Sequence, residues 1–266
     1  MSPINRESEG IILDTLDHGE SDLIVTLYCR HGGRSSAIAK GAKKSKRRFV
    51  NKLELFTFIH VRLKQRNTRS LAILEEAELH SAFLPLRSHI IPYTAASVLR
   101  EFCLLATREG EEDERIFTLL VWSLHHLSLP RPRLSHLQIV MLFLLRFYDY
   151  IGYRPDFSQC FHCGNDGQAD SSSSFGFNTA HGGLICTSCK GSGFSSAIPL
   201  STGTIKTLQL CQDTSLDKLH RLKVQDKSLY EALNVLHRFG KHILQRDIIS
   251  WKMLRQTIKP QRPNWT

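Results

Sequence analysis

The hydrophobic period of this 266-residue chain changes near residue 82. Before that point, apolar and polar residues alternate, most clearly in the run LELFTFIHVRLKQR at 53–66. After it, apolar residues recur at three- and four-residue spacing in 88–108, 114–128 and 134–151. Alternation indicates strands and the longer period indicates helices. We therefore predict an α+β multidomain chain, with a β-rich domain first and an all-α domain after it.

Residues 9–80 contain five strand-like runs separated by turn signals such as Gly32-Gly33. These runs are EGIILDTL, DLIVTLYCR, RSSAIAKGA, LELFTFIHVRLKQR and SLAILEEAELH. Five short strands in so few residues suggest a small closed barrel, and the OB-fold is the best-known five-stranded case. We expect this barrel to bind nucleic acid and to span residues 1–80.

The fourth run has two distinct faces if it is extended throughout. One face is apolar and suits a barrel interior: Leu53, Leu55, Thr57, Ile59, Val61 and Leu63. The other mixes aromatic and cationic side chains: Glu54, Phe56, Phe58, His60, Arg62 and Lys64. Binders of single-stranded nucleic acid use such a mixture. The alternative is that Phe56 and Phe58 pack under the helical domain.

The stretch AKGAKKSKRRF at 39–49 holds six cations and no carboxylate, between the third and fourth strand runs. The whole chain carries a net charge of +10, which favours an acidic partner such as nucleic acid. A solvated face and a nuclear-targeting signal are the rival interpretations. We predict that the nucleic-acid-binding residues are Arg34, Lys40, Lys43, Lys44, Lys46, Arg47 and Arg48, extended by Arg62, Lys64 and Arg66.

Four cysteines form two C-x2-C pairs with 22 residues between them: Cys160, Cys163, Cys186 and Cys189. Four thiolates with this spacing favour a closed, structural zinc site, with one ion per chain. An iron–sulfur cluster would accept the same ligands. Disulfides are disfavoured, because an odd total of seven cysteines and a polar N-terminus indicate a reducing, cytoplasmic environment.

We expect the cysteine-rich segment 155–197 to be an insertion in a helical domain formed by 81–154 and 198–256, followed by a flexible tail at 257–266. Helical periodicity returns at 201–211 and at 228–255. The sequence contains no phosphate-binding loop, no H-E-x-x-H and no paired carboxylates suited to two-metal chemistry. A protein that is not an enzyme is therefore the expectation.

Five segments resemble the bacterial RecO recombination mediators in the same order: GIILDTLDHGESDLIVTLY, AIAKGAKKSKRRF, GYRPDFSQCFHCG, GGLICTSC and LSTGTIKTL. The resemblance implies an OB-fold, a helical domain and a zinc-binding insertion held by the four cysteines above. It implies binding to single- and double-stranded DNA, annealing, and work with RecR, with the tail of single-strand binding protein, and with RecF and RecA. It also implies a place in the cytoplasm, at the nucleoid.

Two other functions stay open at this point. One is a zinc-ribbon adaptor that binds RNA, because an OB-fold does not separate DNA from RNA by stacking and charge. The other is a zinc-dependent nuclease, which would need an open coordination position on the metal. Competition between matched oligonucleotides tests the first, and cleavage by metal-loaded protein tests the second.

Overall fold

The computed structural model describes residues 4–65, 70–131, 133–166, 175–190 and 196–258. They form two compact units, an N-terminal unit of residues 1–130 and a C-terminal unit of residues 131–266. The domain boundaries expected from the sequence remain a prediction. Most of the expected tail, residues 259–266, lies outside the described residues.

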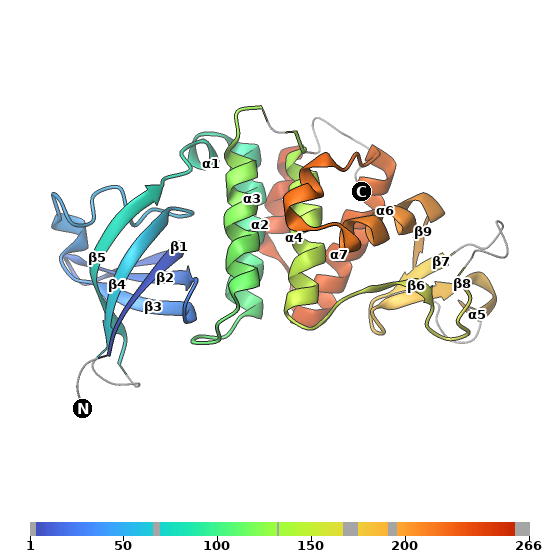
Figure 1. Ribbon diagram of the computed structural model, residues 1–266, viewed down its shortest axis with the longest axis horizontal. Helices are drawn as coiled ribbons and strands as arrows, with labels where there is room; N and C mark the ends of the chain where they lie inside the picture. Colours follow the sequence, from blue (N-terminus) through green and yellow to red (C-terminus); the bar gives the residue numbers. More distant parts are fainter. Residues whose placement is uncertain (1–3, 66–69, 132, 167–174, 191–195, 259–266) are drawn as a thin grey trace. The chain divides into compact units, whose positions relative to one another are not determined.

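A closed five-stranded barrel forms the first part of the N-terminal unit, which confirms the expected OB-like fold (Figure 1). Around the barrel the order is β1-β2-β3-β5-β4, and only the β3–β5 pair is parallel among the pairings of these strands. Closure leaves no free sheet edge for another chain to pair with. The strands are β1 (Ile4–His18), β2 (Asp22–Cys29), β3 (Gly33–Ala39), β4 (Phe58–Gln65) and β5 (Ala72–Ser81).

Alternation in the strands places one set of side chains inside the barrel. Ile59, Val61 and Leu63 of β4 are buried, as the sequence predicts, and they join one continuous core cluster. That cluster also includes Phe49 and Leu53, which lie in the long connection between β3 and β4. The connection therefore contributes to the barrel interior and is held to it.

The predicted fourth strand is wrong over residues 53–57, because β4 begins at Phe58. Phe56 has a φ of 68°, a left-handed backbone conformation outside the β region of regular strands. The backbone of Phe56 and Thr57 exchanges hydrogen bonds with Ile12 at 2.9 and 3.0 Å, but the chain turns here. As a result Phe56 is buried, and it does not line an outward face.

Three helices complete the N-terminal unit: α1 (Pro85–Ser88), α2 (Ile90–Ala106) and α3 (Glu114–Ser128). Asp113 caps α3 by accepting from the N–H of Arg115. The ring of Phe56 meets Tyr93 of α2 at 5.7 Å, and that of Phe58 meets Phe117 of α3 at 6.0 Å. The two phenylalanines therefore pack against helices, as the alternative interpretation of the fourth run expected.

In the C-terminal unit, α6 and α7 pack against α4, whose residues are buried on most sides. Tyr148 of α4 donates to the carbonyl of Leu236 in α7 at 2.7 Å. The expected single run 228–255 is two helices, since Gln245 adopts a φ of 52° and ends the first. These helices are α4 (His136–Tyr150), α6 (Thr202–Asp213), α7 (Asp226–Leu244) and α8 (Ile249–Ile258), with a 3₁₀ turn at Leu216–Arg221.

A small four-stranded sheet also belongs to the C-terminal unit, with the order β6-β8-β7-β9 (Figure 1). Phe177 of this sheet contacts Phe157 and also Phe239 of α7, which ties the sheet to the helices. Its strands are β6 (Asp156–Cys160), β7 (Phe175–Asn178), β8 (Gly183–Cys186) and β9 (Ile198–Leu200), and a short helix, α5 (Thr187–Lys190), follows β8.

Among the described residues, no helix has the length and apolar character needed to cross a membrane.

Candidate nucleic-acid interface and metal centre

The basic loop, residues 40–49, starts from a backbone anchor at the barrel end. Gly41 has a φ of 67° and opens a 3₁₀ turn at Ala42–Lys44. The N–H of Gly41 donates to the Asp22 carboxylate at 2.7 Å, and the N–H of Lys43 donates to the Ser21 carbonyl at 2.9 Å. The Asp22 carboxylate also accepts a hydrogen bond from the hydroxyl of Ser21. The bond from Gly41 lowers the pKa of Asp22 most, and the bond from Ser21 lowers it further. This shift indicates that the anchor favours the ionised carboxylate.

The far side of the basic loop is held by apolar packing and by Lys52. Phe49 is only 4% exposed and joins the barrel core together with Leu53. Lys52 donates to the carbonyls of Arg48 at 3.0 Å and Ala77 at 2.7 Å. The loop is therefore fixed at both ends, and an aromatic residue inside a cationic run serves as its hydrophobic anchor.

All six cations of the basic loop are exposed. Two of them also hold the loop: Lys43 pairs with Asp17 at 3.1 Å, and Arg48 donates to the carbonyl of Lys40 at 2.5 Å while covering the Phe49 ring. The other four form no ion pair with any carboxylate that the structure describes: Lys40, Lys44, Lys46 and Arg47. The basic loop is thus a positive surface with little internal compensation.

Arg62 and Lys64 lie on the outer face of β4, where carboxylates surround them. Arg62 pairs with Glu7 and Glu75 at 3.8 Å each and also with Glu76, and Lys64 pairs with Glu75 at 3.5 Å. These acidic residues come from β1 and β5, so that strand pairing places them beside β4. Their negative charge offsets that of the two cations. Arg62 and Lys64 therefore differ from the basic loop, where most cations form no ion pair with a described carboxylate. Arg66 lies outside the described residues.

Arg34 lies at the opposite end of β3 from the basic loop. Lys40 lies six positions further along the chain, which is about 20 Å in an extended strand. Its guanidinium donates to the carbonyl of Leu104 in α2 at 2.5 Å, and its own carbonyl accepts from the N–H of Gly110 at 2.9 Å. The structure therefore places Arg34 at the junction of barrel and helices and does not bring it to the other predicted residues.

The four predicted cysteines converge in the C-terminal unit. Their sulfur atoms all lie within 4.8 Å of one another, and those of Cys163 and Cys186 are 3.7 Å apart. A tetrahedral zinc ion with Zn–S bonds of about 2.3 Å requires sulfurs roughly 3.8 Å apart. The donor set and its spacing therefore fit zinc, held by Cys160, Cys163, Cys186 and Cys189.

Cys160 ends β6 and Cys163 lies in the turn after it, whereas Cys186 ends β8 and Cys189 lies in α5. Phe161 donates to the carbonyl of Leu184 at 2.8 Å, which holds the turn after β6 against β8, and Gly164 has a φ of 72° that suits the turn. Burial would raise the pKa of Cys160, but N–H groups of Cys186, Cys163 and His162 lower it to about 6. These donors favour the thiolate, which is the form that binds a metal.

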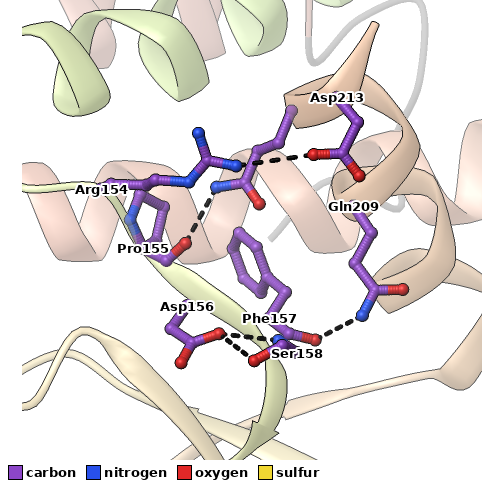
Figure 2. A pocket seen from close by; sticks show the side chains of 8 residues that line it. Arg154, Pro155, Asp156, Phe157, Ser158, Gln209 and Asp213 are labelled. Carbon is purple, nitrogen blue, oxygen red and sulfur yellow. Dashed lines mark hydrogen bonds and ion pairs between the residues drawn. The ribbon is translucent and has the colours of Figure 1, made fainter.

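A cavity of about 410 Å³ lies between β6 and α6 in the same unit (Figure 2). Its polar groups satisfy one another across the two elements: Gln209 donates to the Phe157 carbonyl at 2.7 Å, and Gln212 donates to that of Pro155 at 2.8 Å. Arg154 pairs with Asp213 at 3.5 Å. The cavity therefore marks the junction that orients β6, at whose end Cys160 lies.

Sequence reasoning missed the residues that hold the basic loop in place. Asp22 looked like an ordinary first residue of a strand, and no local signal marks it as a partner of Gly41. Phe49 carried a usable signal, since a phenylalanine next to three cations at 46–48 is costly to expose. The interface thus consists of predicted cations on a support that the sequence alone did not reveal.

Two family models match the chain: Recombination protein O N terminal over residues 1–83, and Recombination protein O C terminal over residues 87–252. A DNA repair protein RecO of Syntrophobacter fumaroxidans is 32% identical over 249 residues, covering 94% of this chain and 96% of the relative. One of Syntrophus aciditrophicus is 32% identical over 93% of this chain and 94% of the relative. One of Desulfitobacterium hafniense is 29% identical, covering 92% of this chain and 88% of the relative. The chain therefore belongs to the recombination protein O family, RecO.

Proposed function

We propose that this chain acts in DNA repair and recombination by binding single- and double-stranded DNA and annealing complementary strands. The observation that carries the proposal is the basic loop, which is anchored by Asp22 and Phe49. Four of its exposed cations form no ion pair with a carboxylate among the described residues: Lys40, Lys44, Lys46 and Arg47. The names of the relatives, DNA repair protein RecO, support the role in DNA repair.

The mechanism needs no bond to be made or broken in the protein. Fixed cations neutralise phosphates and release counterions, so that DNA gathers on the barrel. Lower charge repulsion between two bound strands then lets complementary bases pair by their own hydrogen bonds. A folded loop offers these cations at a lower entropic cost than a disordered tail does, because its backbone is already ordered. We therefore propose a mediator and not an enzyme.

Arg62 and Lys64 have a smaller part in this proposal. Their ion pairs with Glu7, Glu75 and Glu76 would have to break before they contact phosphates. Arg34, at the other end of β3, would meet a different section of a long strand. Zinc, bound by the four cysteines, would hold the turn after β6 and the helix α5 after β8 together and supply structural stability.

RecR, the C-terminal tail of single-strand binding protein, RecF and RecA are the protein partners that we propose from family membership. With RecR, the chain would help to load RecA onto strands coated by single-strand binding protein. This work would take place in the cytoplasm, on the nucleoid. The family match supports this set of partners, and each needs its own binding measurement.

The test is strand annealing followed across a salt series, with and without single-strand binding protein. If about five cations of the basic loop meet phosphates, single-strand affinity should fall with salt at a log–log slope of about −3.5. Annealing should slow in parallel. A flat salt dependence, or no annealing at low salt, contradicts the proposal. Tighter binding to a matched RNA than to DNA would favour an RNA adaptor in its place.

A further inference from the structure

The two units differ sharply in net charge. Residues 1–130 carry 18 Lys and Arg against 16 Asp and Glu, whereas residues 131–266 carry 17 against 9. The barrel unit is therefore nearly balanced despite its basic loop, and the C-terminal unit holds most of the excess positive charge. An excess of this size on a folded surface attracts polyanions.

Part of that excess gathers where α7 ends and α8 begins. Lys241 and Lys252 share one carboxylate, that of Asp247, at 2.6 and 3.0 Å. Arg238 lies one turn before Lys241 on α7, and Arg255 lies one turn after Lys252 on α8. We call these four cations the α7–α8 surface; three of them are exposed and Arg255 is half-buried.

Contacts beneath the α7–α8 surface fix the two helices to each other. The ring of His237 in α7 stacks on that of Trp251 in α8, with centroids 4.4 Å apart and planes 3° apart. Burial lowers the pKa of His237 most, Lys241, Arg255 and Arg238 lower it further, and Asp247 raises it, so all four charges act on this ring. Among the described residues, Arg238 and Arg255 form no ion pair.

Apolar side chains lie next to these cations on α8. Ile249 is 67% exposed and Met253, one turn later, is 41% exposed. A single strand offers phosphates to the cations and the apolar faces of unpaired bases to these aliphatic side chains.

We propose that the α7–α8 surface binds a second nucleic-acid strand, so that one chain holds two strands at once. This inference rests on the proposed function, because annealing brings two strands together. Its chemistry is the same as that of the basic loop, namely phosphate neutralisation, but its residues lie in the other unit. The shared carboxylate of Asp247 limits its strength, since phosphates compete with it for Lys241 and Lys252.

The experiment uses the full chain and two non-complementary, differently labelled DNA 30-mers, so that no duplex forms. Binding of the first strand is followed by anisotropy, and capture of the second by energy transfer between the labels. The test variant is Arg238→Gln, Lys241→Gln and Lys252→Gln together. The matched control is Lys206→Gln, Lys218→Gln and Lys223→Gln, three exposed lysines of the same unit that lie outside α7 and α8.

We expect the test variant to bind the first strand within about twofold of the unchanged chain and to lose second-strand capture at least tenfold. Its salt slope for the second event should become shallower by about 2. The control should keep both events. Asp247→Asn frees both lysines and should strengthen second-strand capture several-fold, which tests the surface even if the triple variant folds poorly.

Retention of second-strand capture by a folded test variant overturns the inference while leaving the proposed function intact. Equal loss in the control also overturns it, because only overall charge would then matter. Loss of binding to an acidic peptide without any change in strand capture assigns the surface to a protein partner and overturns it as well. Failure of the unchanged chain to bind even the first strand rejects the proposed function itself.

Discussion

The N–H of Gly41 donates to the carboxylate of Asp22 at 2.7 Å, which ties the start of the basic loop to the start of β2. Strand β3 also pairs with β2, so the loop leaves the barrel beside the strand that anchors it. A run of cations that would scatter in a disordered tail is held in this way at one end of a barrel.

Replacing Asp22 tests whether this anchor matters for binding. Asp22→Ala removes the acceptor, whereas Asp22→Asn keeps an oxygen for the N–H of Gly41 and makes the same change in charge. Since a hydrogen bond to a neutral acceptor contributes about 0.5–1.5 kcal/mol, Asp22→Ala should bind single strands about two- to tenfold more weakly than Asp22→Asn. The measurement is anisotropy at fixed salt. Equal affinities would show that loop order does not contribute.

Removal of a zinc ligand should affect the C-terminal unit far more than it affects DNA binding. Cys160→Ser leaves three sulfurs, and the turn after β6 and the helix α5 lose their common ion. Metal analysis should find about one zinc per unchanged chain and much less in the variant. Hydrogen exchange should rise in residues 156–166 and 175–190 and stay the same in the barrel strands.

The control for that experiment is Cys211→Ser, which changes a buried cysteine outside the cluster. It should leave zinc content unchanged. If Cys160→Ser keeps its stability and zinc but loses DNA binding, the four cysteines serve DNA binding and not the stability of the C-terminal unit.

His237 should make stability depend on pH. Burial, with smaller contributions from Lys241 and Arg255, lowers the pKa of His237 from 6.5 to about 4. The folded state keeps the ring neutral while the unfolded state takes up a proton below pH 6.5, so stability is lost as the pH falls from 6.5 towards 4. Between pH 7 and pH 5 the loss should be about 2 kcal/mol.

The variant for this prediction is His237→Phe, which keeps an aromatic ring against Trp251 and cannot titrate. Urea unfolding at pH 7 and pH 5 measures the free energy of both proteins. The variant should lose about 2 kcal/mol less than the unchanged chain over this interval. Identical pH dependence in the two proteins would assign the effect to other groups.

The barrel and the zinc ligands could be predicted because their signals are local. Alternation within each strand and the spacing of the cysteine pairs need no knowledge of distant residues. The same local rules failed at Phe56 and at Gln245. At both residues the backbone turns into the left-handed conformation, although the hydrophobic pattern of the sequence continues past them. Neither residue is a glycine, so the sequence carried no mark of the turn.

The surroundings of the predicted cations depended on strand register, which the sequence does not show. Arg62 looked like an extension of the basic loop, yet the pairing of β4 with β5 places it opposite Glu76. Arg34 likewise lies in β3, the strand that leads into the basic loop, but at the end of β3 away from that loop. A count of charges identifies a basic surface only after the partners of each charge are known.

The central claim is that exposed cations on a fixed loop, which form no ion pair among the described residues, bind the DNA backbone. The most direct test replaces Lys40, Lys44, Lys46 and Arg47 together with Ala, which spares Lys43 and Arg48, the cations that also hold the loop. The matched control replaces four exposed lysines of the other unit: Lys206, Lys218, Lys223 and Lys227. Single-strand affinity should fall at least tenfold, with a salt slope shallower by about 3, only in the loop variant. Unchanged affinity and slope in a folded loop variant would contradict the account.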